Sequence, residues 1–219
     1  MIRLGLSASI VITGLMVAAS LYGWTHIAPE TQIPVRWNLD GEATSFMSRN
    51  AVIFLFPAVA ILTSIVFAFA VSIDPRKENV TKSEGLVLTT WIGSLAVLGV
   101  GHALFVSAAM AERSINTPAI ISVVAFFIAV IGNYLGKSRS SWFFGFQTPW
   151  GLLSEDAWIA SNRAVGRLWV ATALAAIIAI WFEPRIIGVL ILIIGVIASL
   201  LIGVFIAYRV WRADPDRVH

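Results

Sequence analysis

The chain offers few side chains that could carry out chemistry. Its 219 residues include three His and no Cys, which excludes disulfides, thiolate metal sites and thiol nucleophiles. His26 follows the first apolar run and His219 ends the chain, which argues against a metal site with three His ligands. His102 lies within the third apolar run, where an ionisable group suggests function. A neutral His can instead bond a Ser or a carbonyl of a neighbouring helix, and we favour this packing role because no acidic residue lies inside any apolar run.

Sequence motifs of enzymes are missing from the chain. It contains no HExxH, no Gly-x-Ser-x-Gly, no phosphate loop and no dinucleotide-binding fingerprint. Paired carboxylates at membrane depth are also absent. We therefore expect no catalytic, cofactor-binding or metal-binding residues, and we do not expect an enzyme.

The composition indicates an integral membrane protein. The chain is 58% hydrophobic and only 12% charged, whereas soluble domains carry about 25% charged residues. A helix needs about 20 mostly apolar residues to cross a bilayer, and continuously apolar runs exclude barrel strands, which alternate. The sequence predicts an all-α, polytopic membrane protein with six transmembrane helices: Leu4–Trp24, Ala51–Ile73, Leu86–Ala111, Ala119–Leu135, Val165–Phe182 and Ile186–Tyr208.

The distribution of basic residues predicts the orientation. With the N-terminus inside, 11 of the 15 Lys and Arg residues fall in inner segments and 4 in outer ones, as the positive-inside rule requires. Both termini are then cytoplasmic. The first apolar run could be a signal peptide, but it is longer than a usual one and five more spans follow, so we expect a retained helix.

The outer connection, residues 25–50, has the pattern of a folded loop. Ile33, Val35 and Trp37 alternate with polar residues and Pro34, which is typical of an extended segment. The residues 39–42 contain Asp-Gly and predict a tight turn. We expect this loop to fold against the membrane surface, and we read the polar inner connection, residues 74–85, as a solvated turn.

The segment Asn133–Leu168 is the longest that no bilayer could hold as a span, and it is dense in Trp, Gly, Pro and capping residues. Thr148 and Ser154 are candidate N-caps of two helices, the second of which runs on into the fifth span. Trp142, Trp150 and Trp158 suit headgroup depth.

Two further spacings in this part of the chain have competing readings. Arg163 and Arg167 share a helix face, which suits either anionic headgroups or an acidic partner. Gly132 and Gly136, like Gly195, Ser199 and Gly203, suit close packing of helices, which we expect within one chain.

The motif pattern of this segment resembles the bacterial SdpI immunity family. The family pattern contains Asn-x-x-Gly-Lys, Gly-x-x-Thr-Pro-Trp, Ser-Glu-x-x-Trp and Asn-Arg-x-x-Gly. The matching residues are Asn133, Gly136, Lys137, Gly145, Thr148, Pro149, Trp150, Ser154, Glu155, Trp158, Asn162, Arg163 and Gly166.

The outer connection resembles the small module that often precedes this family, whose core reads Ile-Pro-x-His-Trp-Asn-x-x-Gly. Arg36 stands where the module usually has His, and Gln147 stands where the inner pattern usually has Arg. The matching residues are Ile33, Pro34, Trp37, Asn38 and Gly41.

The resemblance implies three parts and a function. The parts are a two-helix module (residues 1–85) with an extracytoplasmic loop, a third helix with a short outer turn (86–117), and an SdpI-like module (118–219) with a cytoplasmic loop at 137–163. The family's namesake protects its cell from a secreted, membrane-active peptide toxin and holds a transcriptional repressor at the membrane. The resemblance thus implies a bacterial plasma-membrane immunity or signalling protein, with lipids, a peptide toxin and a repressor as partners and no direct nucleic-acid binding.

Two other functions stay open from the residues alone. A small transporter or efflux protein would need a polar pathway at mid-membrane and inverted repeats, of which the sequence shows little. An accessory subunit of a larger membrane complex is equally compatible with the sequence.

Overall fold

The structure, a computed structural model, describes residues 1–37, 43–111, 117–182 and 184–215. This part of the chain is mainly helical. Its elements are α1 (Ile2–His26), β1 (Gln32–Trp37), β2 (Ala43–Ser48), α2 (Arg49–Ile73), α3 (Lys77–Lys82), α4 (Glu84–Met110), α5 (Thr117–Leu135), α6 (Pro149–Leu153), α7 (Glu155–Ala179) and α8 (Ile186–Ala213).

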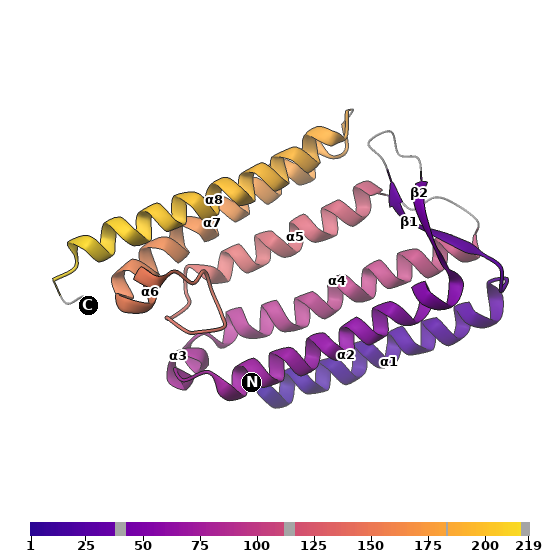
Figure 1. Ribbon diagram of the computed structural model, residues 1–219, viewed down its shortest axis with the longest axis horizontal. Helices are drawn as coiled ribbons and strands as arrows, with labels where there is room; N and C mark the ends of the chain where they lie inside the picture. Colours follow the sequence, from indigo (N-terminus) through magenta and orange to yellow (C-terminus); the bar gives the residue numbers. More distant parts are fainter. Residues whose placement is uncertain (38–42, 112–116, 183, 216–219) are drawn as a thin grey trace.

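The long helices form two groups of three (Figure 1). In the first group, Met16 of α1, Ala60 of α2 and Trp91 of α4 share one buried cluster. In the second, α5, α7 and α8 meet through small residues such as Ala125, Ala173 and Ala176. The third long helix therefore packs with the first two. The boundaries predicted for the three sequence modules stay predictions, because packing alone does not divide the chain.

Glycine permits the closest helix contact in the second group. A Cβ on Gly132 would lie 2.6 Å from the carbonyl oxygen of Gly166, and a Cβ on Gly166 would overlap the carbonyl oxygen of Gly132. The helices α5 and α7 can cross backbone to backbone only because neither residue has a side chain. Two glycines of α8 allow similar close packing. The side chain of Thr172 packs against Gly195, and those of Val165 and Phe146 pack against Gly203. The predicted packing within one chain is confirmed at these positions.

Five helices are long and apolar enough to cross a membrane: α1, α2, α4, residues 118–135 of α5, and α8. The chain is thus a multi-pass membrane protein. Within the described residues α7 does not meet this criterion, because its first half carries Arg163 and Arg167. It nevertheless lies alongside α5 and α8 (Figure 1). The predicted sixth span therefore stays a prediction.

Two connections lie at opposite ends of the bundle. At one end β1 and β2 form an antiparallel hairpin, in which Ile33 pairs with Met47 and Pro34 with Phe46. We call residues 32–48 the outer hairpin, after the predicted orientation. The predicted extended segment is confirmed in β1, whereas β2 was not predicted, and the expected tight turn at 39–42 lies outside the described residues. The other end holds α3, α6, the start of α1 and the end of α8 (Figure 1), together with residues 136–154, which we call the inner loop.

Candidate functional site

Two side-chain caps shape the second part of the inner loop. Thr148 Oγ1 accepts a hydrogen bond from the Gly151 amide at 2.9 Å, and Pro149 occupies the first turn of α6. Ser154 Oγ accepts from the Ala157 amide at 3.1 Å and donates to the carboxylate of Asp214 after α8. Both predicted N-caps are confirmed, and the second ties the start of α7 to the end of α8.

Asn162 holds the middle of the loop against α7. Its Oδ1 accepts from the Phe146 amide at 2.8 Å, and its Nδ2 donates to the carbonyl oxygens of Phe146 at 3.1 Å and Trp158 at 3.0 Å. The side chain is fully buried. Because the amide pairs with both polar groups of one residue, it replaces a strand partner for the loop backbone.

Gly145 is required by the same contact. Its φ is +105°, a conformation that L side chains rarely adopt. A Cβ there would lie 2.5 Å from the indole ring of Trp158 and 3.2 Å from Asn162 Oδ1. Glycine therefore allows both the turn and the close approach to α7.

Trp158 is a core residue of this region. It is completely buried, and its Nε1 donates to Ser138 Oγ at 3.2 Å. Protein encloses the ring on all sides, which excludes the lipid contact of an interfacial Trp, and the predicted depth of Trp158 stays a prediction. By contrast Trp142 is 54% exposed, and Trp150 is half-buried with its ring 5.3 Å from that of Tyr208. Asn162 and Val165 are buried on the same helix as Trp158.

Asp74, which we did not predict as a site residue, anchors the first part of the loop. It is fully buried at the end of α2. Its Oδ2 accepts from the amides of Trp142 at 3.0 Å and Phe143 at 3.3 Å, while Oδ1 accepts from the Arg76 amide at 2.8 Å. Three backbone donors satisfy a carboxylate that would otherwise be costly to bury.

Arg76 and Asn79 extend this anchor to α3. Arg76 donates from Nη1 to Ser140 Oγ at 2.6 Å and from Nη2 to the Leu152 carbonyl oxygen at 2.7 Å. Asn79 Nδ2 donates to the Ser140 carbonyl oxygen at 2.9 Å. The prediction of a solvated turn at 74–85 is therefore wrong, since side chains of this connection form hydrogen bonds to the inner loop.

Glu155 joins the same network from α7. Its Oε2 accepts from Ser140 Oγ at 2.7 Å, and its Oε1 lies 3.5 Å from Arg139 Nη1. The amide of Arg139 also donates to Ser83 Oγ at 2.8 Å, just before α4. The inner loop is thus bonded to both helix groups, and Arg139 is paired with a carboxylate of α7.

The other predicted inner residues lie near the surface between α5 and α7. Asn133 and Lys137 are exposed, and Gly136 packs against Arg163, whose Cα would lie 3.2 Å from a Cβ at Gly136. Arg163 and Arg167 are exposed on α7, and neither forms an ion pair with a described residue. The structure thus divides the predicted set into buried residues that form the loop, such as Thr148, Ser154 and Asn162, and exposed residues at its surface.

The outer hairpin is fixed at its base by Arg49, which is only 8% exposed. Its Nη1 donates to the carbonyl oxygens of Trp24 at 3.1 Å and Ile27 at 2.6 Å, at the end of α1, and its amide donates to the Thr31 carbonyl oxygen at 3.2 Å. We predicted Arg49 only as one of the outer basic residues. Its position between a cap residue and an apolar run gave no signal of this role.

The predicted outer residues are placed in part. Ile33 is 2% exposed, and Pro34 is half-buried on β1. Trp37 ends β1, but its side chain lies outside the described residues, as do Asn38 and Gly41 altogether. Phe46 on β2, which we did not predict, is 54% exposed.

His102 lies in the packing environment that the sequence favoured. It is 1% exposed, and its Nε2 lies 3.0 Å from Ser20 Oγ and 3.1 Å from the Met16 carbonyl oxygen. Ser20 donates to the Ile53 carbonyl oxygen at 2.8 Å, so Nε2 carries the proton and donates to α1. Within the described residues, no group of three or more His, Cys, Asp or Glu could hold a metal ion.

Two known protein families match this chain, one in its N-terminal part and one in its C-terminal part. The SdpI/YfhL protein family matches residues 137–208, and a domain family of unknown function, DUF1648, matches residues 11–61. The chain is 22% identical over 209 residues to "Immunity protein SdpI" of Bacillus subtilis (strain 168), an alignment that covers 93% of this chain and 94% of that relative. No solved structure matches the chain significantly. The chain is thus a multi-pass membrane protein whose residues 137–208 match the SdpI/YfhL protein family and which is similar to Immunity protein SdpI along most of its length.

Proposed function

We propose that this chain is an immunity protein of a bacterial cell membrane that protects its cell from a secreted, membrane-active peptide. The observation that carries the proposal is the end-to-end similarity to Immunity protein SdpI, which includes the outer hairpin and the inner loop rather than the helices alone. A likeness limited to apolar helices would carry little functional information, because apolar composition is common to all membrane bundles. No catalytic chemistry is part of the proposal.

The proposed topology has six spans with both termini in the cytoplasm. The inner-loop end of the bundle carries most of the basic residues, as the positive-inside rule requires. The helix α7 supports the sixth span, because it connects the inner loop to the short turn before α8. Reporter fusions after residue 45 should read outside, and fusions after residues 80 and 145 should read cytoplasmic. The reverse pattern would overturn this topology.

The outer hairpin is the proposed contact for the peptide. It lies at the end of the bundle that faces outward in this topology, and it exposes Phe46 while it buries Ile33. An exposed aromatic residue on a paired strand offers apolar area to a partner at little entropic cost.

The test is a survival assay with variants of the family-motif residues. We expect Trp37→Ala or Asn38→Ala to abolish protection while the protein still inserts at normal level. Glu30→Ala, an exposed residue before β1, is the matched control and should protect like the wild type. If a chain with the hairpin replaced by a Gly-Ser linker protected as well as the intact one, the hairpin would not be the sensor.

A second proposed role concerns the cytoplasmic face of α7. The exposed Arg163 and Arg167 lie four residues apart, so they occupy one helix face, and neither is neutralised by a described carboxylate. We propose that this face docks an acidic surface of a soluble regulator, such as a repressor, which the chain would hold at the membrane.

Charge reversal separates this role from protection. Arg163→Glu with Arg167→Glu should leave insertion and survival intact and release the bound regulator in a pull-down of soluble proteins with the wild-type and reversed chains. Lys77→Glu with Arg3→Glu is the control with the same change of charge at exposed positions. Loss of protection with unchanged pull-down would show that the arginines serve only the bundle.

A further inference from the structure

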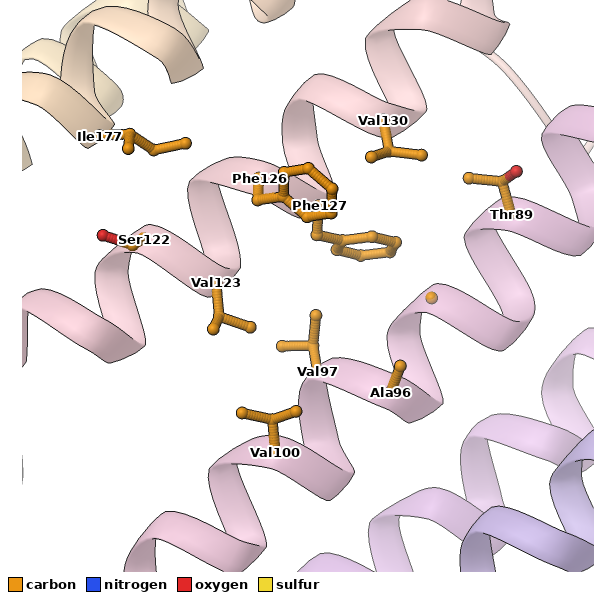
Figure 2. A pocket seen from close by; sticks show the side chains of 11 residues that line it. Thr89, Ala96, Val97, Val100, Ser122, Val123, Phe126, Phe127, Val130 and Ile177 are labelled. Carbon is orange, nitrogen blue, oxygen red and sulfur yellow. The ribbon is translucent and has the colours of Figure 1, made fainter.

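A groove of about 550 Å³ separates the two helix groups along one side. It is lined by residues of α4 and α5, with Ile177 of α7 at its edge (Figure 2). Its walls are apolar apart from Thr89 and Ser122. Phe126, 64% exposed, stands at the opening. The groove therefore opens sideways, toward the lipid.

A second, polar pocket of about 210 Å³ lies at the inner-loop end of the same two helices. Gly85, Thr89 and Gly93 are spaced four apart on α4, so the two pockets lie on one stripe of that helix. On α5, Val130 and Tyr134 connect them in the same way. The polar pocket is lined by Lys82, Ser83, Gly85, Leu86, Tyr134, Lys137 and Ser138.

The polar pocket is positively charged. Lys137 Nζ lies 5.3 Å from the ring centroid of Tyr134, which holds it over the pocket wall. Lys82 contacts Glu78 only at 3.9 Å, with both side chains mostly exposed, and such pairs compete weakly with a second anion. Glu84 lies in the sequence between the pocket residues Ser83 and Gly85, but its carboxylate pairs with the amino group of Met1 at 3.2 Å. Among the described residues no carboxylate lines the pocket, so the two ammonium groups at its wall are available to an anion.

The dimensions suit a single lipid chain. From Thr89 to Val100 the groove follows α4 over about 16.5 Å at a rise of 1.5 Å per residue, which is about half of the 30 Å hydrocarbon core. Phe127 lies across Gly93, with one ring carbon 2.9 Å from the position of a Cβ there. The helices α4 and α5 are therefore too close at this point for a helix about 10 Å wide to enter.

We propose that this groove binds one anionic phospholipid from the leaflet on the inner-loop side. Lys82 and Lys137 bind the headgroup phosphate, and one acyl chain lies between α4 and α5. The bound lipid fills the apolar space between the two helix groups. This site is independent of the proposed immunity function, since it involves neither the outer hairpin nor Arg163 and Arg167.

The test measures lipid retained by the purified full-length protein by native mass spectrometry. Phosphatidylglycerol and phosphatidylcholine with identical acyl chains are added to delipidated protein. Lys82→Gln with Lys137→Gln removes the headgroup contacts, and Ala96→Phe fills the groove from its exposed wall. The matched controls are Lys77→Gln with Arg3→Gln, two exposed cations away from the pocket, and Val66→Phe on an exposed face of α2.

We expect the wild type and both controls to retain phosphatidylglycerol over phosphatidylcholine by about tenfold. The double lysine variant should lose that preference, and Ala96→Phe should lose both lipids. Equal retention of the two lipids by the wild type would overturn the proposal, as would a preference that survives in the lysine variant. A wild-type dimer that Ala96→Phe dissociates, with no lipid retained, would assign the groove to a second copy instead. If Ala96→Phe does not fold, the exposed lysine pair still decides the outcome.

Discussion

The inner loop and the outer hairpin connect helices at opposite ends of the bundle, but they are built by different means. The inner loop is held by side chains that bond its backbone, from Asp74 after α2, Arg76 and Asn79 near α3, and Asn162 on α7. The outer hairpin is held by its own strand pairing and, at its base, by Arg49 of α2, which bonds carbonyl oxygens at the end of α1.

This difference indicates different tasks for the two ends. The anchors of the inner loop come from both helix groups, so its shape depends on how the two groups sit together. The anchors found for the hairpin lie on α1 and α2. The exposed face of β2, which includes Phe46, therefore stays accessible to a partner. A buried polar network fixes one arrangement of the chain, because breaking any of its hydrogen bonds costs much stability. Residues on an exposed strand face, by contrast, can be substituted with little effect on the free energy of folding.

The largest expected effect is on the inner loop, from Trp158→Ala. Truncating a fully buried Trp leaves a cavity beneath Gly145 and Gly151 and removes the bond to Ser138, which should cost about 3–5 kcal/mol. Thermal unfolding in detergent measures the loss. Trp142→Ala is the control in the same loop, since Trp142 is 54% exposed. Equal melting temperatures for the two variants would contradict the buried role of Trp158.

Asp74→Asn should come next, with a loss of about 2–3 kcal/mol. The asparagine side chain of this variant has a single oxygen acceptor, so it cannot accept hydrogen bonds from all three backbone N–H groups that donate to the Asp74 carboxylate. Its NH₂ group would face at least one of these N–H groups, donor against donor. Limited proteolysis should cut within residues 139–147 more readily. The exposed Asp156→Asn should change neither property, and unchanged proteolysis in the Asp74 variant would show that the anchor is dispensable.

Gly145→Ala should cost about 2 kcal/mol, since a side chain at φ +105° is strained and meets the Trp158 ring. Gly14→Ala is the opposite case, because nothing lies within 4 Å of its Cβ position in α1. There, alanine should stabilise by about 0.5–1 kcal/mol. The two melting temperatures should therefore move in opposite directions, and a shift in the same direction would contradict this assignment.

Phe46→Ala should have the smallest effect on stability and a clear effect on function. Its side chain is half exposed, so the free energy of unfolding should change by less than about 0.5 kcal/mol. Survival against the peptide should fall nevertheless, if the exposed strand face is the contact. Full protection by this variant, with Ile33→Ala as the destabilised comparison, would exclude Phe46 from the contact.

Much of the fold follows from local sequence signals. The apolar runs predict the long helices, and Thr148 and Ser154 mark helix starts because capping depends on residues three apart. The alternation at Ile33 and Val35 predicts β1. The partner strand β2 has no such signal, since its two large apolar residues, Phe46 and Met47, are adjacent and do not alternate with polar residues.

The buried network was beyond sequence reasoning because its partners are distant in the chain. Asp74 and Arg76 bond residues more than 60 positions away, and a polar connection after a span looks the same whether solvent or protein receives it. The burial of Trp158 was missed for the same reason, as an interfacial Trp and a core Trp share one local pattern. The family motif identified the loop residues but not the α2–α3 connection that holds them.

An exchange of segments tests most directly the claim that the outer hairpin recognises and the inner loop holds. Residues 32–47 of this chain are replaced by the aligned segment of Immunity protein SdpI from Bacillus subtilis, and in a second chimera residues 139–150 are exchanged instead. Each chimera is challenged with the peptides that the two parents resist. The account predicts that resistance specificity moves with the hairpin and stays unchanged when the inner loop is exchanged. Specificity that follows the inner loop, or neither segment, would contradict it.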